Sequence, residues 1–362
     1  MYSEKAKKHA DACRFCWMCR HLCPVEQVTG READTPRAKG LLVSMFERGL
    51  VMDADAAETM YGCMMCGSCT NDCATGYEPP LYIREARSQA VMADLTPASV
   101  QAVLDRLERT GNMYGATECK VDFQDAPETG ETLVWLGATA RYSVPETANA
   151  LLSLLRKAGV PFAALREEPS SGSALGDLIG FLEDVRQQAK KVSQAVRTSG
   201  AKRMVVLDSY DAALFLHEYK DWGIELPQVL TATSFVNELV KSGKLTVKPA
   251  PLSVSYHDGS RLARDLDEHE PARELLAAMG CEIHEMFLNR RLSKCCGSAV
   301  AGQFMPEVRK GSAENRWGDM KRTEASTLVA ACPQSTEALG STVPPGYAYQ
   351  DLFVLLDQRT EP

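Results

Sequence analysis

Apolar side chains recur every three or four residues along the first third of this 362-residue chain. Proline opens three of these stretches, at Pro36, Pro79 and Pro97, and glycine follows two of them, at Gly49 and Gly111. Proline in the first turn and glycine after the last turn are common boundaries of a helix. The pattern predicts amphipathic helices over residues 36–48, 54–60, 79–91 and 97–110.

Beyond residue 130 the pattern changes to short apolar strands that alternate with helices. Four stretches have strand character, at residues 133–136, 204–207, 252–256 and 328–330. Strand, helix and strand in this order predict crossover connections and a parallel sheet. The pattern also occurs twice, because the helical segment that begins near Glu146 recurs 124 residues later at Glu270. We therefore expect two pseudo-symmetric α/β lobes with parallel sheets.

Eight of the 13 cysteines form two copies of the motif Cys-x2-Cys-x2-Cys-x3-Cys, at residues 13–23 and 63–73. This is the spacing of ferredoxins that hold two [4Fe-4S] clusters, in which the fourth cysteine of each run ligates the other cluster. The expected ligand sets are Cys13, Cys16, Cys19 and Cys73 for one cluster, and Cys63, Cys66, Cys69 and Cys23 for the other. The intervening residues predict helices, so the first domain is expected to be an α-helical double-cluster ferredoxin domain.

Two other uses of these cysteines fit the pattern less well. Disulfides need an oxidising compartment, but the N-terminus is charged and has no apolar signal segment, which predicts a cytoplasmic protein with reduced thiols. Structural zinc favours paired Cys-x2-Cys knuckles on separate loops over triplets with a spaced fourth cysteine. Iron-sulfur ligation is therefore the preferred interpretation, with zinc and disulfides as minor alternatives.

The composition narrows the range of partners. A net charge of −8 leaves no basic stripe for nucleic acid. The apolar stretches are far shorter than the roughly 20 residues that span a bilayer, so we expect membrane contact only through a partner protein. The chain also lacks a Gly-x-Gly-x-x-Gly fingerprint after a strand and a Walker-type loop, so no nicotinamide, flavin or nucleotide site is predicted.

The C-terminal two thirds resembles the duplicated cysteine-rich (CCG) domain of heterodisulfide reductase and of the iron-sulfur subunits of glycolate oxidase, lactate-utilisation and anaerobic glycerol-3-phosphate dehydrogenase systems. The resemblance rests on Cys295-Cys296-Gly297 and Cys332, and extends to Thr35-Pro36-Arg37 and residues 111–115 in the N-terminal part. We expect four parts: the ferredoxin domain over residues 1–92, a helical connector and linker over 93–130, and CCG-type lobes over 131–249 and 250–362.

The first CCG-type copy departs furthest from the pattern of that family. In the family, each copy has an upstream cysteine, a Cys-Cys-Gly element and a later Cys-x2-Cys. Here these positions read Ala138, Ser170-Ser171-Gly172 and a stretch over residues 207–212 without cysteine. The first lobe is therefore expected to bind no cluster.

The second copy keeps three of the five family thiols, at Cys295, Cys296 and Cys332, and has serine at the other two positions, Ser260 and Ser335. Three thiolates could hold a cubane with one open iron, or a zinc ion completed by His257. The alternatives are buried free thiols, and a histidine that only completes a turn. A third metal centre at these residues is thus the less favoured hypothesis.

The sequence therefore predicts clusters without a site for two-electron chemistry. We expect an iron-sulfur electron-transfer subunit of a multi-subunit oxidoreductase, which takes electrons singly from a flavin-containing dehydrogenase subunit. The acceptor would be a quinone, a ferredoxin or an electron-transferring flavoprotein. The alternative is a heterodisulfide-reductase-like thiol/disulfide enzyme that uses Cys295, Cys296 and Cys332. Exposed faces near Trp17 and Met64–Met65 are expected to pass the electrons, because a cluster must lie close to its partner.

Overall fold

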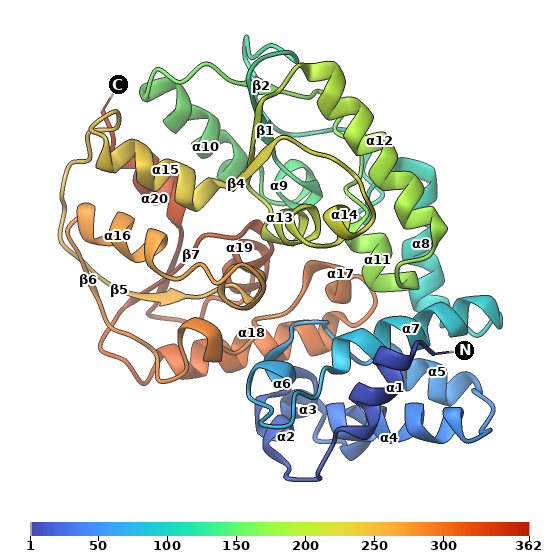
Figure 1. Ribbon diagram of the computed structural model, residues 1–362. Helices are drawn as coiled ribbons and strands as arrows, with labels where there is room; N and C mark the ends of the chain where they lie inside the picture. Colours follow the sequence, from blue (N-terminus) through green and yellow to red (C-terminus); the bar gives the residue numbers. More distant parts are fainter. Residues whose placement is uncertain (1, 362) are drawn as a thin grey trace.

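The computed structural model describes residues 2–361. Its N-terminal part is helical. The helices there are α1 (Glu4–Asp11), α2 (Met18–Leu22), α3 (Pro24–Thr29), α4 (Pro36–Glu47), α5 (Ala54–Tyr61), α6 (Ser68–Asn71), α7 (Pro79–Met92) and α8 (Ala98–Thr110). In Figure 1 the first of these helices lie together beneath the rest of the molecule, and the last, α8, runs upward beside α11 (Ser173–Ile179) and α12 (Glu183–Ser199). The four helices that the apolar spacing predicts are α4, α5, α7 and α8.

Local chemistry explains where these helices begin and end. The Oγ1 atom of Thr35 accepts a hydrogen bond from the backbone N–H of Ala38 at 3.1 Å, and Pro36 occupies the first turn of α4. A side-chain oxygen at this position satisfies one of the N–H groups that a helix leaves free. Helix α8 ends at Gly111, whose φ of 73° lies in the left-handed region that glycine adopts without strain.

Two four-stranded parallel sheets follow, with the strand orders β2-β1-β3-β4 and β6-β5-β7-β8. The strands are β1 (Thr132–Trp135), β2 (Ala163–Ala164), β3 (Arg203–Val206), β4 (Gln228–Thr231), β5 (Leu252–His257), β6 (Cys281–Ile283), β7 (Thr327–Ala330) and β8 (Ala348–Asp351). Because both sheets have the same order, the predicted pair of pseudo-symmetric parallel lobes is confirmed. We refer to them as lobe 1 (β1–β4) and lobe 2 (β5–β8).

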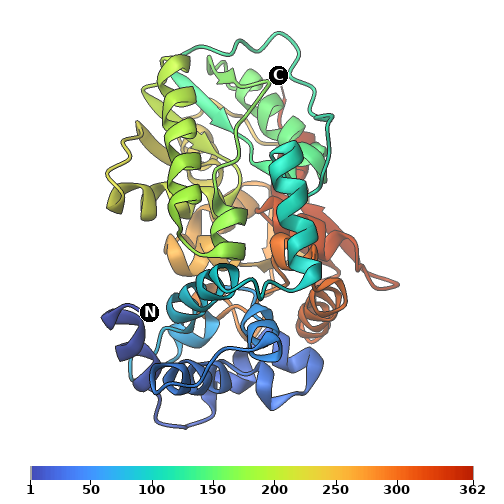
Figure 2. The same cartoon turned by 90° about the vertical axis from the view of Figure 1, so that its right-hand side faces the viewer.

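Helices cover both lobes (Figures 1 and 2). They are α9 (Ala138–Tyr142), α10 (Pro145–Lys157), α11 (Ser173–Ile179), α12 (Glu183–Ser199), α13 (Ser209–Leu216), α14 (Glu218–Asp221), α15 (Ala232–Lys241), α16 (Glu270–Ala278), α17 (Ala299–Gly302), α18 (Pro306–Met320), α19 (Pro333–Gly340) and α20 (Leu352–Gln358). Helix α10 packs against α20 and α15 against α16, so the two lobes share one apolar core.

Helix α18 connects lobe 2 to the N-terminal helices, and Figure 1 shows it lying between them. It packs on α3 so closely that a Cβ atom at Gly311 would come within 2.8 Å of the methyl groups of Val28. This contact holds the cysteine-bearing loops against lobe 2. Among residues 2–361, no helix combines the length and the apolar character that crossing a bilayer requires.

Candidate iron-sulfur centres

The two cysteine runs form loops with the same backbone conformation. The first loop lies between α1 and α2, and the second between α5 and α6. In the first, Phe15 and Trp17 have φ of 54° and 69°; in the second, Met65 and Gly67 have φ of 53° and 73°. Side chains other than glycine rarely adopt positive φ, so the repeated conformation is maintained by the surrounding structure.

Both loops also direct a backbone donor at a cysteine sulfur. The N–H of Phe15 donates to Cys13 Sγ, and that of Met65 donates to Cys63 Sγ, each at 3.4 Å. Donors aimed at sulfur stabilise thiolate, which is the form that binds iron. The loops are therefore shaped to present thiolates to a cluster.

The second group of thiols lines a small, mostly apolar cavity. Four cysteines line it, and they are Cys23, Cys63, Cys66 and Cys69. Cys23 thus lies beside the second run, although it belongs to the first. Burial raises the pKa of Cys23 to about 12, and the neighbouring Cys63 and Cys66 contribute to the rise.

The first group of thiols lies near the surface. Burial raises the pKa of Cys19 to about 11, and the charges of Cys13, Cys16 and Cys73 add to the rise. Cys73, from the second run, therefore lies beside the first. Cys16 is exposed, whereas Cys66 and Cys69 of the second run are buried. The two groups thus differ in depth: the first contains an exposed cysteine and no buried one, whereas three of the four cysteines of the second are buried.

In the described part of the chain, no three His, Cys, Asp or Glu side chains gather closely enough to hold a single metal ion. A cubane needs a different arrangement, because each of its four thiolates binds a different corner iron. Four cysteines around a cavity fit that requirement.

The methionines of the second run are not exposed. Met64 and Met65 are 2% and 1% exposed, and Met64 packs against Ser312 of α18, whose Oγ lies 3.9 Å from Met64 Sδ. The expectation of an exposed electron port at Met64–Met65 is therefore wrong, because lobe 2 and the helical core cover this face. Trp17 is 42% exposed and its neighbour Phe15 is 53% exposed, so the first run does reach the surface.

Lobe 2 brings the family cysteine positions together. Cys296 Sγ donates to Ser335 Oγ at 3.5 Å, and the hydroxyl of Ser260 lies near Cys295 and acts to lower the pKa of that thiol against the effect of burial. Cys332 Sγ lies 3.0 Å from the Oγ of Ser209, which belongs to lobe 1. All three thiols are buried.

His257 ends strand β5, as the sequence predicts, and its surroundings keep it neutral. Its Nδ1 accepts a hydrogen bond from Arg316 Nε at 3.1 Å, and its buried Nε2 has no hydrogen-bond partner among residues 2–361. Burial lowers the pKa of His257 well below its usual value, and the charges of Arg316 and Arg264 lower it further. A zinc ion completed by His257 stays a prediction.

One contact joins the second run to lobe 2. Cys66 and Cys295 lie close together and pack in one cluster with Cys23, Val25 and Met64. The neighbouring Cys295 lowers the pKa of Cys66 to about 5 despite its burial, whereas the pKa of Cys295 is raised. The second cysteine run and lobe 2 therefore meet at these two sulfurs.

Lobe 1 has carboxylates where lobe 2 has thiols. Asp211 accepts hydrogen bonds from Ser171, from Ser173 at 2.7 Å and from Trp135 Nε1 at 2.9 Å. Burial raises the pKa of Asp208 to about 8 and that of Glu168 to about 7. Sequence reasoning missed these acids, although Asp208 and Asp211 follow the end of β3, where ligand-binding residues of parallel sheets gather.

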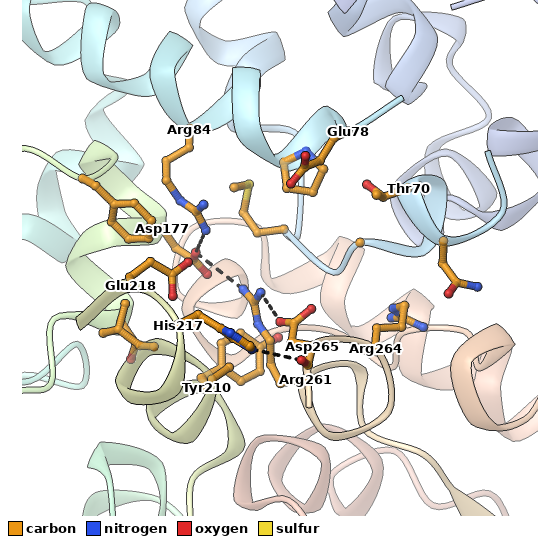
Figure 3. Close-up of a pocket in the computed structure, with 18 of the residues that line it drawn as sticks. Thr70, Glu78, Arg84, Asp177, Tyr210, His217, Glu218, Arg261, Arg264 and Asp265 are labelled. Atoms are coloured by element: carbon orange, nitrogen blue, oxygen red, sulfur yellow. Dashed lines mark hydrogen bonds and ion pairs between the residues drawn. The ribbon is translucent and has the colours of Figure 1, made fainter. Parts of the chain in front are cut away.

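A cleft of 310 Å³ lies where the helical part meets both lobes, and the second cysteine loop borders it through Met65, Gly67 and Thr70. Figure 3 shows Asp177 between Arg84 and Arg261, each 3.7 Å from its Oδ1. These ion pairs tie α7, α11 and the turn that carries Arg261 to one another. The three parts of the chain therefore meet beside the second cysteine run.

Comparison with known proteins agrees with this geometry. The 4Fe-4S dicluster domain family matches residues 9–77, and the cysteine-rich domain family matches residues 254–336. The matched segments contain both cysteine runs and the lobe 2 thiols. Residues 131–249 lie outside these two matched segments.

Three relatives illustrate the similarity. The "Probable membrane-anchored ferredoxin" of Chromohalobacter salexigens is 31% identical, over 80% of this chain and 46% of its own length. The "Probable iron-sulfur-binding oxidoreductase FadF" of Bacillus subtilis is 28% identical, over 82% of this chain and 45% of its own. A subunit of the dihydromethanophenazine:CoB--CoM heterodisulfide reductase of Methanosarcina barkeri is 27% identical, over 89% of this chain and 86% of its own.

The chain spans about half the length of the first two relatives. Its dicluster domain makes [4Fe-4S] clusters its cofactors, as the cysteine spacing predicts. The chain therefore contains a 4Fe-4S dicluster domain and a cysteine-rich domain, and it is similar over most of its length to iron-sulfur proteins of the heterodisulfide reductase and FadF type.

Proposed function

We propose that this chain is an electron-transfer subunit whose two clusters act in series, from the protein surface to lobe 2. The observation that carries the proposal is the difference in depth between the two cysteine groups. The first group contains the exposed Cys16, and the second encloses a cavity and touches lobe 2 through Cys66 and Cys295. When bound, each cluster supplies reversible one-electron chemistry.

The proposed ligands follow from which cysteines lie together. Cys13, Cys16, Cys19 and Cys73 would hold the surface cluster, and Cys63, Cys66, Cys69 and Cys23 the enclosed one. Two features support this exchange of the fourth cysteine: Cys23 lines the cavity of the second run, and Cys73 raises the pKa of Cys19 in the first. We call the surface site cluster 1 and the enclosed site cluster 2.

The proposed electron donor is a flavin-containing dehydrogenase subunit. A reduced flavin releases two electrons and two protons, and the two clusters can take one electron each. The acceptor would be a quinone, a ferredoxin or an electron-transferring flavoprotein. Two relatives support a role within an oxidoreductase complex. The Bacillus subtilis relative is named as an oxidoreductase, and the Methanosarcina barkeri relative is named as one subunit of a reductase.

Anaerobic mixing with photoreduced FMN tests this role. The protein should take up about two electrons per chain, one for each cluster, and return them to menadione. Without a flavoprotein it should not oxidise a hydroxy acid, a polyol phosphate or an amine with a dye as acceptor. Steady turnover of such a substrate by the purified chain alone would contradict the proposal.

A second function is favoured by the Cys66–Cys295 contact alone. The lobe 2 thiols could reduce a disulfide substrate, because its cleavage needs two electrons, which the clusters can supply in succession, and two protons. Reduction of a small disulfide such as 5,5′-dithiobis(2-nitrobenzoate), with photoreduced FMN as electron source, should then be lost in Cys295→Ser and kept in Cys281→Ser. Equal rates in both variants would exclude this role for Cys295.

A further inference from the structure

Three buried cations around the second cysteine run form no salt bridge in the described part of the chain. They are Lys39, Arg87 and Arg264, which are 1%, 1% and 8% exposed. None of them forms an ion pair with an acidic side chain among residues 2–361. A buried charge without a partner is costly in free energy, so the arrangement requires an explanation.

The first two cations lie on the side of the helical domain. Lys39 lines the same cavity as the four cysteines, and its Nζ donates only to the carbonyl oxygen of Asp34, at 2.7 Å. In the described part of the chain, the guanidinium of Arg87 donates only to backbone carbonyl oxygens. One of them is the carbonyl oxygen of Cys63, at 2.7 Å. Both side chains therefore place positive charge beside the sulfurs of the second run.

The third cation comes from lobe 2. Arg264 Nε donates to the carbonyl oxygen of Cys66 at 2.8 Å, and its Nη1 donates to the carbonyl of Ser293 at 2.6 Å. Its buried Nη2 has no hydrogen-bond partner in the described part of the chain. Figure 3 shows Arg264 beneath the cysteine loop, across the cleft from Arg84.

The cations near the first run are arranged differently. Arg20 pairs with Glu26 at 2.9 Å, and Arg37 pairs with Glu32. Arg14, next to Cys13, donates to the carbonyl oxygens of Asp11 and Cys13, and water screens its charge because it is exposed. The cations of the second site are buried instead, and the nearby acids Asp34 and Asp177 act on Lys39 and Arg87 without forming a salt bridge with them.

The cluster itself supplies the missing negative charge. An oxidised cubane core with two positive charges, bound by four thiolates, carries two net negative charges and gains a third on reduction. A cation in a medium of low dielectric stabilises the more negative state more strongly. Because burial alone disfavours the reduced cluster, positive charges at this site act in the opposite direction.

We propose that Lys39, Arg87 and Arg264 compensate the charge of cluster 2 and hold its reduction potential above the value that burial alone would give. The proposal rests on the ligand set proposed above for cluster 2. Two cations belong to the helical domain and one to lobe 2, so the potential of cluster 2 depends on how these two parts are docked. Cluster 1 lacks this dependence.

A redox titration of the anaerobic holoprotein followed by EPR tests the proposal. Lys39→Gln and Arg87→Gln keep a hydrogen-bond donor and remove the charge, whereas Arg87→Lys keeps the charge. Each charge-removing variant should lower the reduced-to-oxidised ratio of cluster 2 at a fixed potential by about tenfold or more, which is 59 mV for a one-electron couple. Arg87→Lys should keep the potential of cluster 2, and cluster 1 should be unaffected in all of them.

Arg141 provides the matched control. It is a buried arginine of lobe 1 that donates to the backbone carbonyls of Leu165 and Arg166, so Arg141→Gln should leave both potentials unchanged. Unchanged potentials in the Lys39 and Arg87 variants, with about eight irons per chain, would overturn the charge proposal. About four irons in the unmodified protein would instead overturn the proposed ligand set, and the two failures are therefore distinguishable.

Discussion

Replacing the fourth cysteine of each run should remove the cluster of the opposite run. The intact protein should hold about eight irons and eight sulfides, and both Cys23→Ala and Cys73→Ala should hold about four. Iron counts alone do not tell which cluster is lost. The structure offers a way to tell, because Cys16 is exposed and the cavity around Cys63, Cys66 and Cys69 is enclosed.

A chelator such as bathophenanthroline disulfonate should therefore remove iron from the intact protein in two phases. Cys23→Ala should keep only the fast phase, which comes from the surface cluster, and Cys73→Ala only the slow phase. Cys119→Ala and Cys281→Ala, outside both runs, should keep both phases. A slow phase that persists in Cys23→Ala would refute the exchange of fourth cysteines, because that cluster would then not need Cys23.

Three further predictions concern pH, packing and the electron port. Burial raises the pKa of Glu168 to about 7 and of Asp208 to about 8, so the folded state holds protons that the unfolded chain has released. The free energy of unfolding should therefore fall as the pH rises from about 4 to 8, by up to about 1.4 kcal/mol per pH unit for each of the two carboxyl groups. Denaturant titrations of Asp208→Asn at several pH values should show a smaller fall. Gly311→Ala should lower the midpoint of thermal unfolding, because the added methyl group clashes with Val28 at a cost of about 1–3 kcal/mol. A second substitution, Val28→Ala, should restore the midpoint. A higher midpoint in Gly311→Ala would show that α3 and α18 move apart to make room for the methyl group. Trp17→Glu should slow electron uptake from the proposed flavoprotein partner in stopped-flow mixing and leave the iron content the same, because Trp17 is exposed beside the first cysteine run. An unchanged rate would mean that electrons enter at another surface.

Elements with strong local patterns were predictable from the sequence. Helices α4 and α7 have proline in the first turn and a regular apolar face, and β1, β3, β5 and β7 are the buried central strands of the sheets. The edge strands β2, β4 and β8 were not predicted. Strand β2 has two residues, and β4 and β8 are partly exposed, so their apolar pattern is too weak to separate them from loops.

The environment of the candidate sites was less predictable than the sites themselves. The motif spacing points to the eight cysteines, but exposure depends on what packs over each loop. Met64 and Met65 are buried because α18 and the helical core cover them, and this contact joins distant parts of the chain, as the Ser312–Met64 separation of 248 residues shows. The isolated cations were equally hidden, since Arg264 reaches Cys66 across 198 residues of sequence.

Sulfur is distributed unequally between the two lobes. In lobe 1, Asp211 accepts three hydrogen bonds in the stretch where the family has thiols. In lobe 2, Cys295 keeps its thiol and lies beside Cys66, a proposed ligand of cluster 2. On the side of cluster 2 that faces the lobes, the nearest sulfur is therefore that of lobe 2, and Asp208 of lobe 1 lies beyond it, near Cys332 and Ser209. If lobe 2 is the exit, Cys295→Ala should slow the oxidation of cluster 2 by menadione and leave that of cluster 1 unchanged in rapid-freeze EPR. Equal slowing of both clusters would indicate a general loss of packing, and no slowing would place the exit at the cleft beside Met65.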